Sequence, residues 1–209
     1  MYKINFYCLI PCLISLFSLI LTACGTPKPT QPLTELSSPQ WLQHKHALQQ
    51  LRYYQVRGAF AYISDKKRTY ARFFWQQDDP EHYRLMLINP LGGSELELTV
   101  QPGFAQLTDN LGKCHIDNNP EALIQRLMDM SVPLNRLRLW ILGLPADASQ
   151  VTLNSQHRLK QLRFQHQEQS WTVDYQAYYE HTLPQLPKKL ELKQKHYRIK
   201  LKIDDWTVK

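Results

Sequence analysis

The sequence contains few of the residues, and none of the short motifs, that common nucleotide-binding and hydrolytic enzymes use. Only seven of its 209 residues are glycine, and neither a Walker loop nor a GxGxxG loop is present, so no phosphate-binding loop is expected. The motifs GxSxG, HExxH and CxxC are also missing. Distant residues can still converge on a site, but the sequence favours a binding protein over an enzyme. We expect no metal site and no cofactor.

The one clear hydrophobic run lies at the N-terminus and is short. Lys3 is the only charged residue before it, and residues 9–21 are almost wholly apolar. A transmembrane helix needs about 20 apolar residues, and this run is shorter. It ends in small residues before Cys24, which is the pattern of a secretory signal peptide. We therefore expect residues 1–23 to be a cleaved signal peptide.

Leu21, Thr22, Ala23 and Cys24 resemble the lipobox of bacterial lipoproteins. In lipoproteins with that motif, cleavage occurs before the cysteine, and its thiol and its new amino group are acylated. The resemblance implies lipid attachment at Cys24. Gly25 follows, and the lack of aspartate there indicates the periplasmic leaflet of the outer membrane as the destination. The alternative is an ordinary secreted protein with a cysteine at this position.

Cysteine is too scarce for a disulfide framework, and acidic residues are outnumbered by basic ones. Of the four cysteines, Cys8 and Cys12 lie in the expected signal peptide and Cys24 would be acylated, so Cys114 has no partner left. The formal net charge is +7. A basic surface suits anionic lipid headgroups or an acidic protein. We expect no nucleic-acid partner for an exported, lipid-anchored chain.

The composition changes near residue 38. Residues 24–38 are rich in proline, threonine and serine, which is typical of a flexible tether. Residues 39–209 suffice for one domain. Their ten or eleven short strand patterns, with turn signals about every ten residues, predict one antiparallel sheet curled into a barrel or sandwich. The clearest patterns lie at residues 55–64, 69–77, 82–89, 94–100, 104–109, 113–117, 158–166, 170–178, 189–194 and 196–204.

Three segments show helical spacing instead. Ser38 at the cap position and Pro39 begin a short amphipathic helix. Residues 120–130 and 134–144 carry apolar stripes with helical spacing, and Gly143 ends the second of them. Because both stripes must be buried, we expect these two helices to cover or plug the curled sheet.

Much of the chain resembles the LolB family of outer-membrane lipoprotein receptors. Two motifs in this order are specific for that family: Asn89, Pro90, Leu91 and Gly92, and later residues 140–145. The likeness covers nearly all of residues 24–209, although residues 129–131 stand where a glycine-containing turn is expected. The segments that carry it are residues 57–64, 70–77, 83–98, 137–145, 170–178, 186–192 and 198–206.

The resemblance implies a mainly β fold with helices (α+β), an unclosed antiparallel β-barrel of about eleven strands with an inserted helical lid and an apolar cavity. Residues 39–209 would form this single half-barrel, the lipoprotein-binding domain. The implied function is to accept acylated lipoproteins from a soluble periplasmic carrier similar to LolA and to insert them into the phospholipid of the outer membrane. No nucleotide and no metal are implied, and we expect a monomer.

Apolar residues of the strands and the lid are candidates for the cavity lining. For each of them the alternative is ordinary core packing, and periodicity alone does not separate the two. The candidates are Phe60, Tyr62, Phe74, Leu85, Leu87, Leu96, Leu98, Trp140 and Ile141.

Leu91 is a candidate for membrane insertion. Asn89, Pro90 and Gly92 occupy the first, second and fourth positions of a type I turn, so Leu91 is third, at the tip of a hairpin. Exposed apolar tips often mark contact with a partner or a membrane. We hypothesise that Leu91 enters the bilayer during delivery. The alternative is a single surface leucine, which is common.

Two other functions stay open at this point. A structural lipoprotein would have a packed core and no ligand, and a lipid-modifying enzyme would need a nucleophile and a base at the cavity. The basic residues around 198–202, with Lys188, Lys189, Lys193 and Lys195, have two explanations as well. They attract an acidic carrier or lipid headgroups, or they form a solvated outer face.

Overall fold

The computed structural model describes residues 36–166 and 169–209. The expected signal peptide, Cys24 and residues 24–35 of the expected tether lie outside the described residues. No helix within the described ranges is both long and apolar enough to cross a bilayer.

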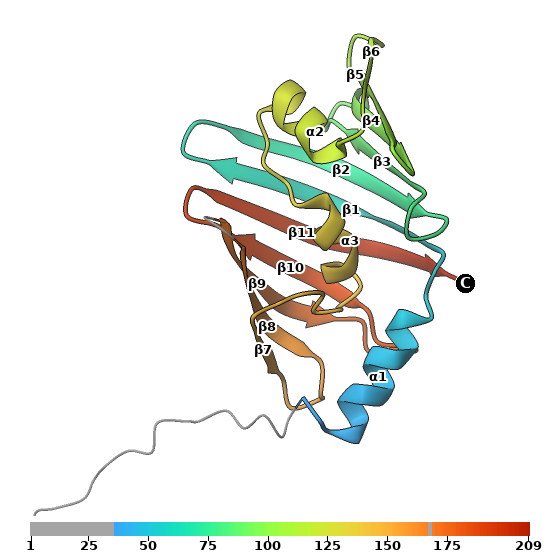
Figure 1. Ribbon diagram of the computed structural model, residues 1–209, viewed down its shortest axis with the longest axis vertical. Helices are drawn as coiled ribbons and strands as arrows, with labels where there is room; N and C mark the ends of the chain where they lie inside the picture. Colours follow the sequence, from blue (N-terminus) through green and yellow to red (C-terminus); the bar gives the residue numbers. More distant parts are fainter. Residues whose placement is uncertain (1–35, 167–168) are drawn as a thin grey trace, which may run out of the picture. The chain divides into compact units, whose positions relative to one another are not determined.

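Within these residues, eleven strands form one antiparallel sheet (Figure 1). Its strand order is β6-β5-β4-β3-β2-β1-β11-β10-β9-β8-β7, so the first and last strands of the chain pair in the middle and β6 and β7 are the edges. The sheet is therefore open, and the predicted unclosed antiparallel architecture is confirmed. The strands are β1 (Tyr54–Ser64), β2 (Arg68–Gln77), β3 (Tyr83–Ile88), β4 (Ser94–Gln101), β5 (Phe104–Asp109), β6 (Cys114–Asp117), β7 (Gln150–Leu153), β8 (Leu159–His166), β9 (Gln169–Tyr178), β10 (Pro187–Lys193) and β11 (Tyr197–Val208).

Alternation of apolar and polar side chains sets the two faces of the sheet. On β4, Leu96 and Leu98 are fully buried, whereas Glu95 and Glu97 point to the other face and are partly exposed. The register places Leu96 opposite Leu87 of β3, so apolar residues of neighbouring strands meet on one face. β11 repeats the pattern, and its inward residues are Ile199, Leu201 and Ile203.

Among the described residues, three helices accompany the sheet. They are α1 (Pro39–Gln49), α2 (Pro120–Met128) and α3 (Leu134–Trp140). α1 begins as predicted, since the Ser38 hydroxyl accepts a hydrogen bond from the Trp41 amide at 3.4 Å. α2 and α3 cross one face of the sheet (Figure 1). Between them, Asp129 has a left-handed φ of 53°, the conformation that glycine adopts most readily.

The central β1–β11 pair contains a bulge in β11, where Asp204 is the extra residue opposite Arg57 and Gly58. The register shifts between Arg57 and Gly58. A Cβ atom at Gly58 would lie 2.1 Å from the carbonyl oxygen of Lys202 and 2.9 Å from the Phe73 ring. The two backbones therefore approach more closely at this point than any side chain would allow.

His44 couples the packing of α1 to pH. Its side chain is buried beside Trp41, with the ring centroids 6.2 Å apart. Burial, and secondarily the charge of Arg158, lowers the pKa of His44 from 6.5 to about 4. Between these values the unfolded chain binds a proton at His44 that the folded chain does not, so the contribution of His44 to stability is complete above pH 6.5 and is lost as the pH falls toward 4.

We expect this loss to be on the order of 2–3 kcal/mol in the free energy of unfolding. Urea unfolding at a series of pH values between 7 and 4 would measure it. His44→Gln cannot titrate, so its unfolding free energy should decline less over that range. An equal decline in the variant would show that other groups cause the effect.

Candidate apolar cavity and hairpin tip

A small apolar cavity lies between the sheet and the pair α2–α3. Its volume is about 30 Å³, and only apolar atoms contribute to its surface. That is close to the space one water molecule occupies in the liquid, whereas pockets for small ligands are about 300–1,000 Å³. The residues that line it are Phe60, Phe73, Trp75, Leu85, Leu87, Ile124, Met130, Val132, Leu134, Leu137, Ile141 and Leu201.

The sheet provides half of this lining. Of the residues predicted from the sequence, Phe60, Leu85 and Leu87 border the cavity, while Tyr62, Leu96 and Leu98 are buried in the core around it. Phe73, Trp75 and Leu201 were not among the predicted lining residues, and they border it as well. The strands thus present a continuous apolar surface to the helices.

The predicted position of Phe74 is wrong. Phe73 and Trp75 are buried on the inner face, and Phe74, between them, lies on the opposite face across from Arg57 of β1. Aromatic residues occur on both faces of β2, so the aromatic pattern alone did not identify the inner one. Arg72 shares the face of Phe74 and is exposed, and this charged residue is the signal that could have identified the outer face.

The lid, defined here as residues 120–144, provides the other half. Ile141 of the predicted residues borders the cavity, and Trp140 is fully buried beside Phe164, with ring centroids 6.0 Å apart. The lid residues that sequence analysis did not single out for the lining are Ile124, Met130, Val132, Leu134 and Leu137. Met130, Leu134 and Leu137 lie on the predicted helical stripes, whereas Ile124 and Val132 do not, and the part of the sheet that the stripes cover could not be predicted.

Side chains of the sheet fasten the lid through its backbone. The Tyr175 hydroxyl donates to the Trp140 carbonyl at 2.9 Å. The Tyr54 hydroxyl is shared between the Gln77 side-chain oxygen at 3.1 Å and the Arg138 carbonyl at 3.3 Å. Burial raises the pKa of both tyrosines well above the usual range, so both hydroxyls stay protonated and can donate. At the other end of the lid, the Lys67 ammonium donates to the Met128 carbonyl at 2.9 Å.

Leu91 lies at the tip of the β3–β4 hairpin and is 97% exposed. The Gly92 amide donates to the Asn89 carbonyl at 2.9 Å, which closes the turn. The Asn89 side-chain oxygen accepts from the amides of Leu91 and Gly93 at 2.9 and 3.0 Å. Gly92 has φ of 90°, where glycine is favoured. The turn is thus held by its own residues, and the Leu91 side chain projects into solvent.

The basic outer face of β10 and β11 is partly neutralised. Glu191 is buried among cations, with its carboxylate 3.4 Å from both Lys193 and Arg198 and 3.8 Å from Lys200. Lys188 and Lys189 are exposed. In the part of the chain that the structure describes, no three His, Cys, Asp or Glu side chains form a group suited to a metal ion.

Comparison with known proteins identifies the family. The family described as outer membrane lipoprotein LolB matches residues 52–206. The chain belongs to the LolB family. The outer-membrane lipoprotein LolB of Yersinia enterocolitica serotype O:8 / biotype 1B is 56% identical over 207 residues, which covers 99% of this chain and 98% of that relative. The LolB protein of Serratia proteamaculans is 56% identical over 197 residues, with 94% and 95% covered.

A solved structure shows the same fold. A LolA superfamily protein from Nitrosomonas europaea superposes with a TM-score of 0.53 over 81% of this chain and 92% of its own, at 11% sequence identity. The open sheet with helices on one face is therefore common to this LolB family member and to a LolA superfamily protein. Fold and family both agree with the resemblance found in the sequence.

Proposed function

We propose that this protein is an outer-membrane lipoprotein receptor. It accepts acylated lipoproteins from a soluble periplasmic carrier similar to LolA and inserts them into the phospholipid of the outer membrane, where acyl chains on Cys24 anchor it. The observation that carries the proposal is a wholly apolar cavity between an open sheet and a separate helical lid, in a chain of the LolB family. The role is trafficking and involves no covalent chemistry on the cargo.

The energetics of acyl chains explain why such a cavity is needed. Each methylene removed from water is worth about 0.8 kcal/mol, so one sixteen-carbon chain represents on the order of 12 kcal/mol. A multiply acylated protein therefore needs an apolar shelter while it crosses an aqueous space. An open sheet provides one, because its backbone groups are hydrogen-bonded to neighbouring strands while its side chains face the ligand.

The volume of the cavity implies that the lid moves. A space of about 30 Å³ does not accommodate an acyl chain, so the structure corresponds to a closed form. The lid residues that face the sheet would separate from Phe60, Leu87 and Trp75 to admit the chain. The few hydrogen bonds to the lid backbone are the contacts that opening must break, and acyl burial offsets their loss.

Transfer needs no external energy if the affinity for acyl chains increases from the carrier to the receptor to the bilayer. Cargo moves from carrier to receptor when the receptor binds the acyl chains more tightly, and from receptor to membrane when the bilayer binds them more tightly still. Equal affinities of carrier and receptor would contradict this scheme. The order of the affinities then gives the pathway its direction.

A transfer assay with purified components tests the proposal. Residues 24–209 carrying Cys24→Ala would be mixed with a radiolabelled acylated lipoprotein bound to its carrier. We expect the label to move onto this protein without ATP. Cargo without acyl chains is the control and should not move. If the acylated label stays on the carrier at all concentrations, the cavity is ordinary core packing and the protein is a structural lipoprotein.

A further inference from the structure

Four hairpin turns whose residues are all described emerge at one end of the sheet. Strands that follow one another along the chain are antiparallel, so the β1–β2, β3–β4 and β5–β6 turns leave the same end. The β10–β11 turn joins them, because Ser64 at the end of β1 pairs with Tyr197 at the start of β11. We call this end of the sheet the turn end. The β9–β10 loop, residues 179–186, lies at the opposite end.

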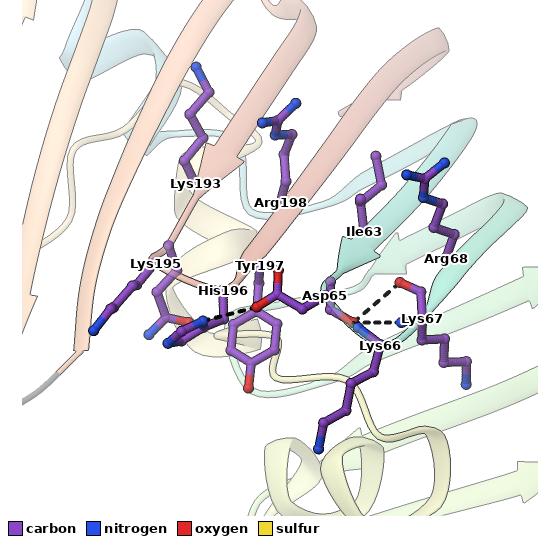
Figure 2. Close-up of a pocket in the computed structure, with 12 residues that line it drawn as sticks. Ile63, Asp65, Lys66, Lys67, Arg68, Lys193, Lys195, His196, Tyr197 and Arg198 are labelled. Atoms are coloured by element: carbon purple, nitrogen blue, oxygen red, sulfur yellow. Dashed lines mark hydrogen bonds and ion pairs between the residues drawn. The ribbon is translucent and has the colours of Figure 1, made fainter.

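A basic cleft lies between two of these turns. It has a volume of about 750 Å³ and is bordered by six basic side chains and one carboxylate (Figure 2). The carboxylate belongs to Asp65, which is hydrogen-bonded to His196 across the cleft. The Asp65 Oδ2 and His196 Nδ1 atoms are 3.1 Å apart. The six basic residues are Lys66, Lys67, Arg68, Lys193, Lys195 and Arg198.

Three of these cations are available to a ligand. Within residues 36–166 and 169–209, Lys66, Arg68 and Lys195 have no ion-pair partner, and all three are exposed. The others are engaged: Lys193 pairs with Asp174 at 2.9 Å, and Lys67 donates to the Met128 carbonyl. The cleft therefore presents uncompensated positive charge to solvent.

A second leucine at the turn end repeats the geometry of Leu91. The Gly112 amide donates to the Asp109 carbonyl at 3.0 Å, and the Asp109 side chain accepts from the amides of Leu111 and Lys113 at 2.9 and 3.0 Å. Gly112 has φ of 76°. Leu111 occupies the same third position as Leu91 and is 87% exposed.

The two leucine tips belong to consecutive hairpins. Strands β4 and β5 pair directly, with Leu96 opposite Asp109. The hairpin tips are therefore about two strand spacings apart across the sheet and about two residues apart along it, a separation of roughly 12 Å. One exposed leucine is common on a protein surface. Two leucines in the same kind of turn, at the same end as a cleft with free cations, form the pattern of a membrane-contacting surface: apolar tips beside basic side chains.

We propose that the turn end is a membrane-docking surface, in which Leu111 inserts beside Leu91 and the basic cleft binds the headgroups of anionic phospholipid in the same bilayer. This rests on the proposed function, since it takes the bilayer that receives the cargo as the partner. It adds a second insertion residue and a lipid class. Insertion supplies affinity for any bilayer, and the cleft supplies preference for negative charge.

Vesicle binding in the absence of cargo tests the proposal. Residues 24–209 with Cys24→Ala lack the acyl anchor and retain the compact unit Leu33–Lys209. Binding would be measured by flotation with vesicles of phosphatidylethanolamine and phosphatidylglycerol, and with vesicles of phosphatidylethanolamine and phosphatidylcholine. Leu111→Glu should weaken binding to both about tenfold. Lys66→Glu and Lys195→Glu should each weaken binding to the anionic vesicles about fivefold.

Leu183→Glu is the matched control. Leu183 is 93% exposed but lies in the β9–β10 loop at the opposite end, so its replacement should not change binding. The proposal is overturned if Leu111→Glu binds like the unmodified protein, if Leu183→Glu weakens binding equally, or if the lysine variants keep the anionic preference. Competition by inorganic phosphate that abolishes this preference would assign the cleft to free phosphate instead.

These outcomes are independent of cargo transfer. The vesicles contain neither lipoprotein nor carrier, so vesicle binding can persist when the transfer assay fails. Conversely, uptake of acylated cargo with no vesicle binding would leave the receptor function in place and remove the docking surface. Circular dichroism of each variant would show that the fold is retained.

Discussion

Leu91→Glu is expected to accept lipoprotein from the carrier normally and to insert it into membranes about ten to a hundred times more slowly. Leu91 is almost fully exposed and is not among the residues that line the cavity, so acyl binding should not depend on it. Insertion loses the burial of one leucine, about 1.5–3 kcal/mol, and glutamate adds the cost of bringing a charge to the bilayer. The two steps would be measured separately, with labelled cargo on the protein and in vesicles.

A conservative variant separates hydrophobicity from shape at this position. Leu91→Met keeps an apolar side chain on the same turn, and its insertion rate should stay close to that of the unmodified protein. If Leu91→Glu inserts cargo at the normal rate, the tip has no role in delivery and Leu91 is a surface leucine without function.

Gly58→Ala is expected to cause the largest loss of stability. The added methyl group would lie 2.1 Å from the Lys202 carbonyl oxygen, which is backbone and cannot rotate away. The central β1–β11 pair must therefore separate. We expect the free energy of unfolding to fall by at least about 3 kcal/mol and the melting temperature to fall by roughly 6–12 °C. Thermal unfolding followed by circular dichroism would measure this.

Gly103→Ala is the control for this effect. Gly103 has φ of 69°, but no atom lies within 4 Å of the position of a new Cβ. Its replacement costs only backbone strain, about 1–2 kcal/mol. Equal losses at the two positions would show that conformational strain, and not close backbone approach, explains the need for glycine at Gly58.

The strands and helices could be predicted where a regular pattern persists along the chain. Local residue types determine the alternation in β4 and β11 and the helix cap at Ser38. The turn that carries Leu91 was predictable from Asn89 and Gly92. β7 is absent from the predicted strands because it has only the residues Gln150–Leu153, of which one, Leu153, is buried. A strand this short shows no alternation that could be distinguished from a loop.

The site was less predictable because it depends on contacts between distant segments. Half of the cavity lining comes from the lid, and no local pattern specifies which strand an inserted helix will cover. The basic cleft depends on pairing of β1 with β11, so Asp65 and His196, 131 positions apart in the chain, meet at one point. The volume of the cavity in this closed form depends on how closely the lid and the sheet pack. Amino-acid composition does not predict that packing.

In the proposed docking surface, the two leucine turns would separate membrane affinity from folding stability. Each turn is held by one Asn or Asp side chain and a glycine with positive φ, and the leucine at its third position is exposed and contributes almost nothing to the core. Evolution can therefore replace that one residue with a larger, smaller or polar one while the β-sheet stays equally stable. If the tips contact the bilayer as proposed, the same freedom makes them useful positions for engineering, because the depth and strength of that contact could be graded there without a penalty to the fold.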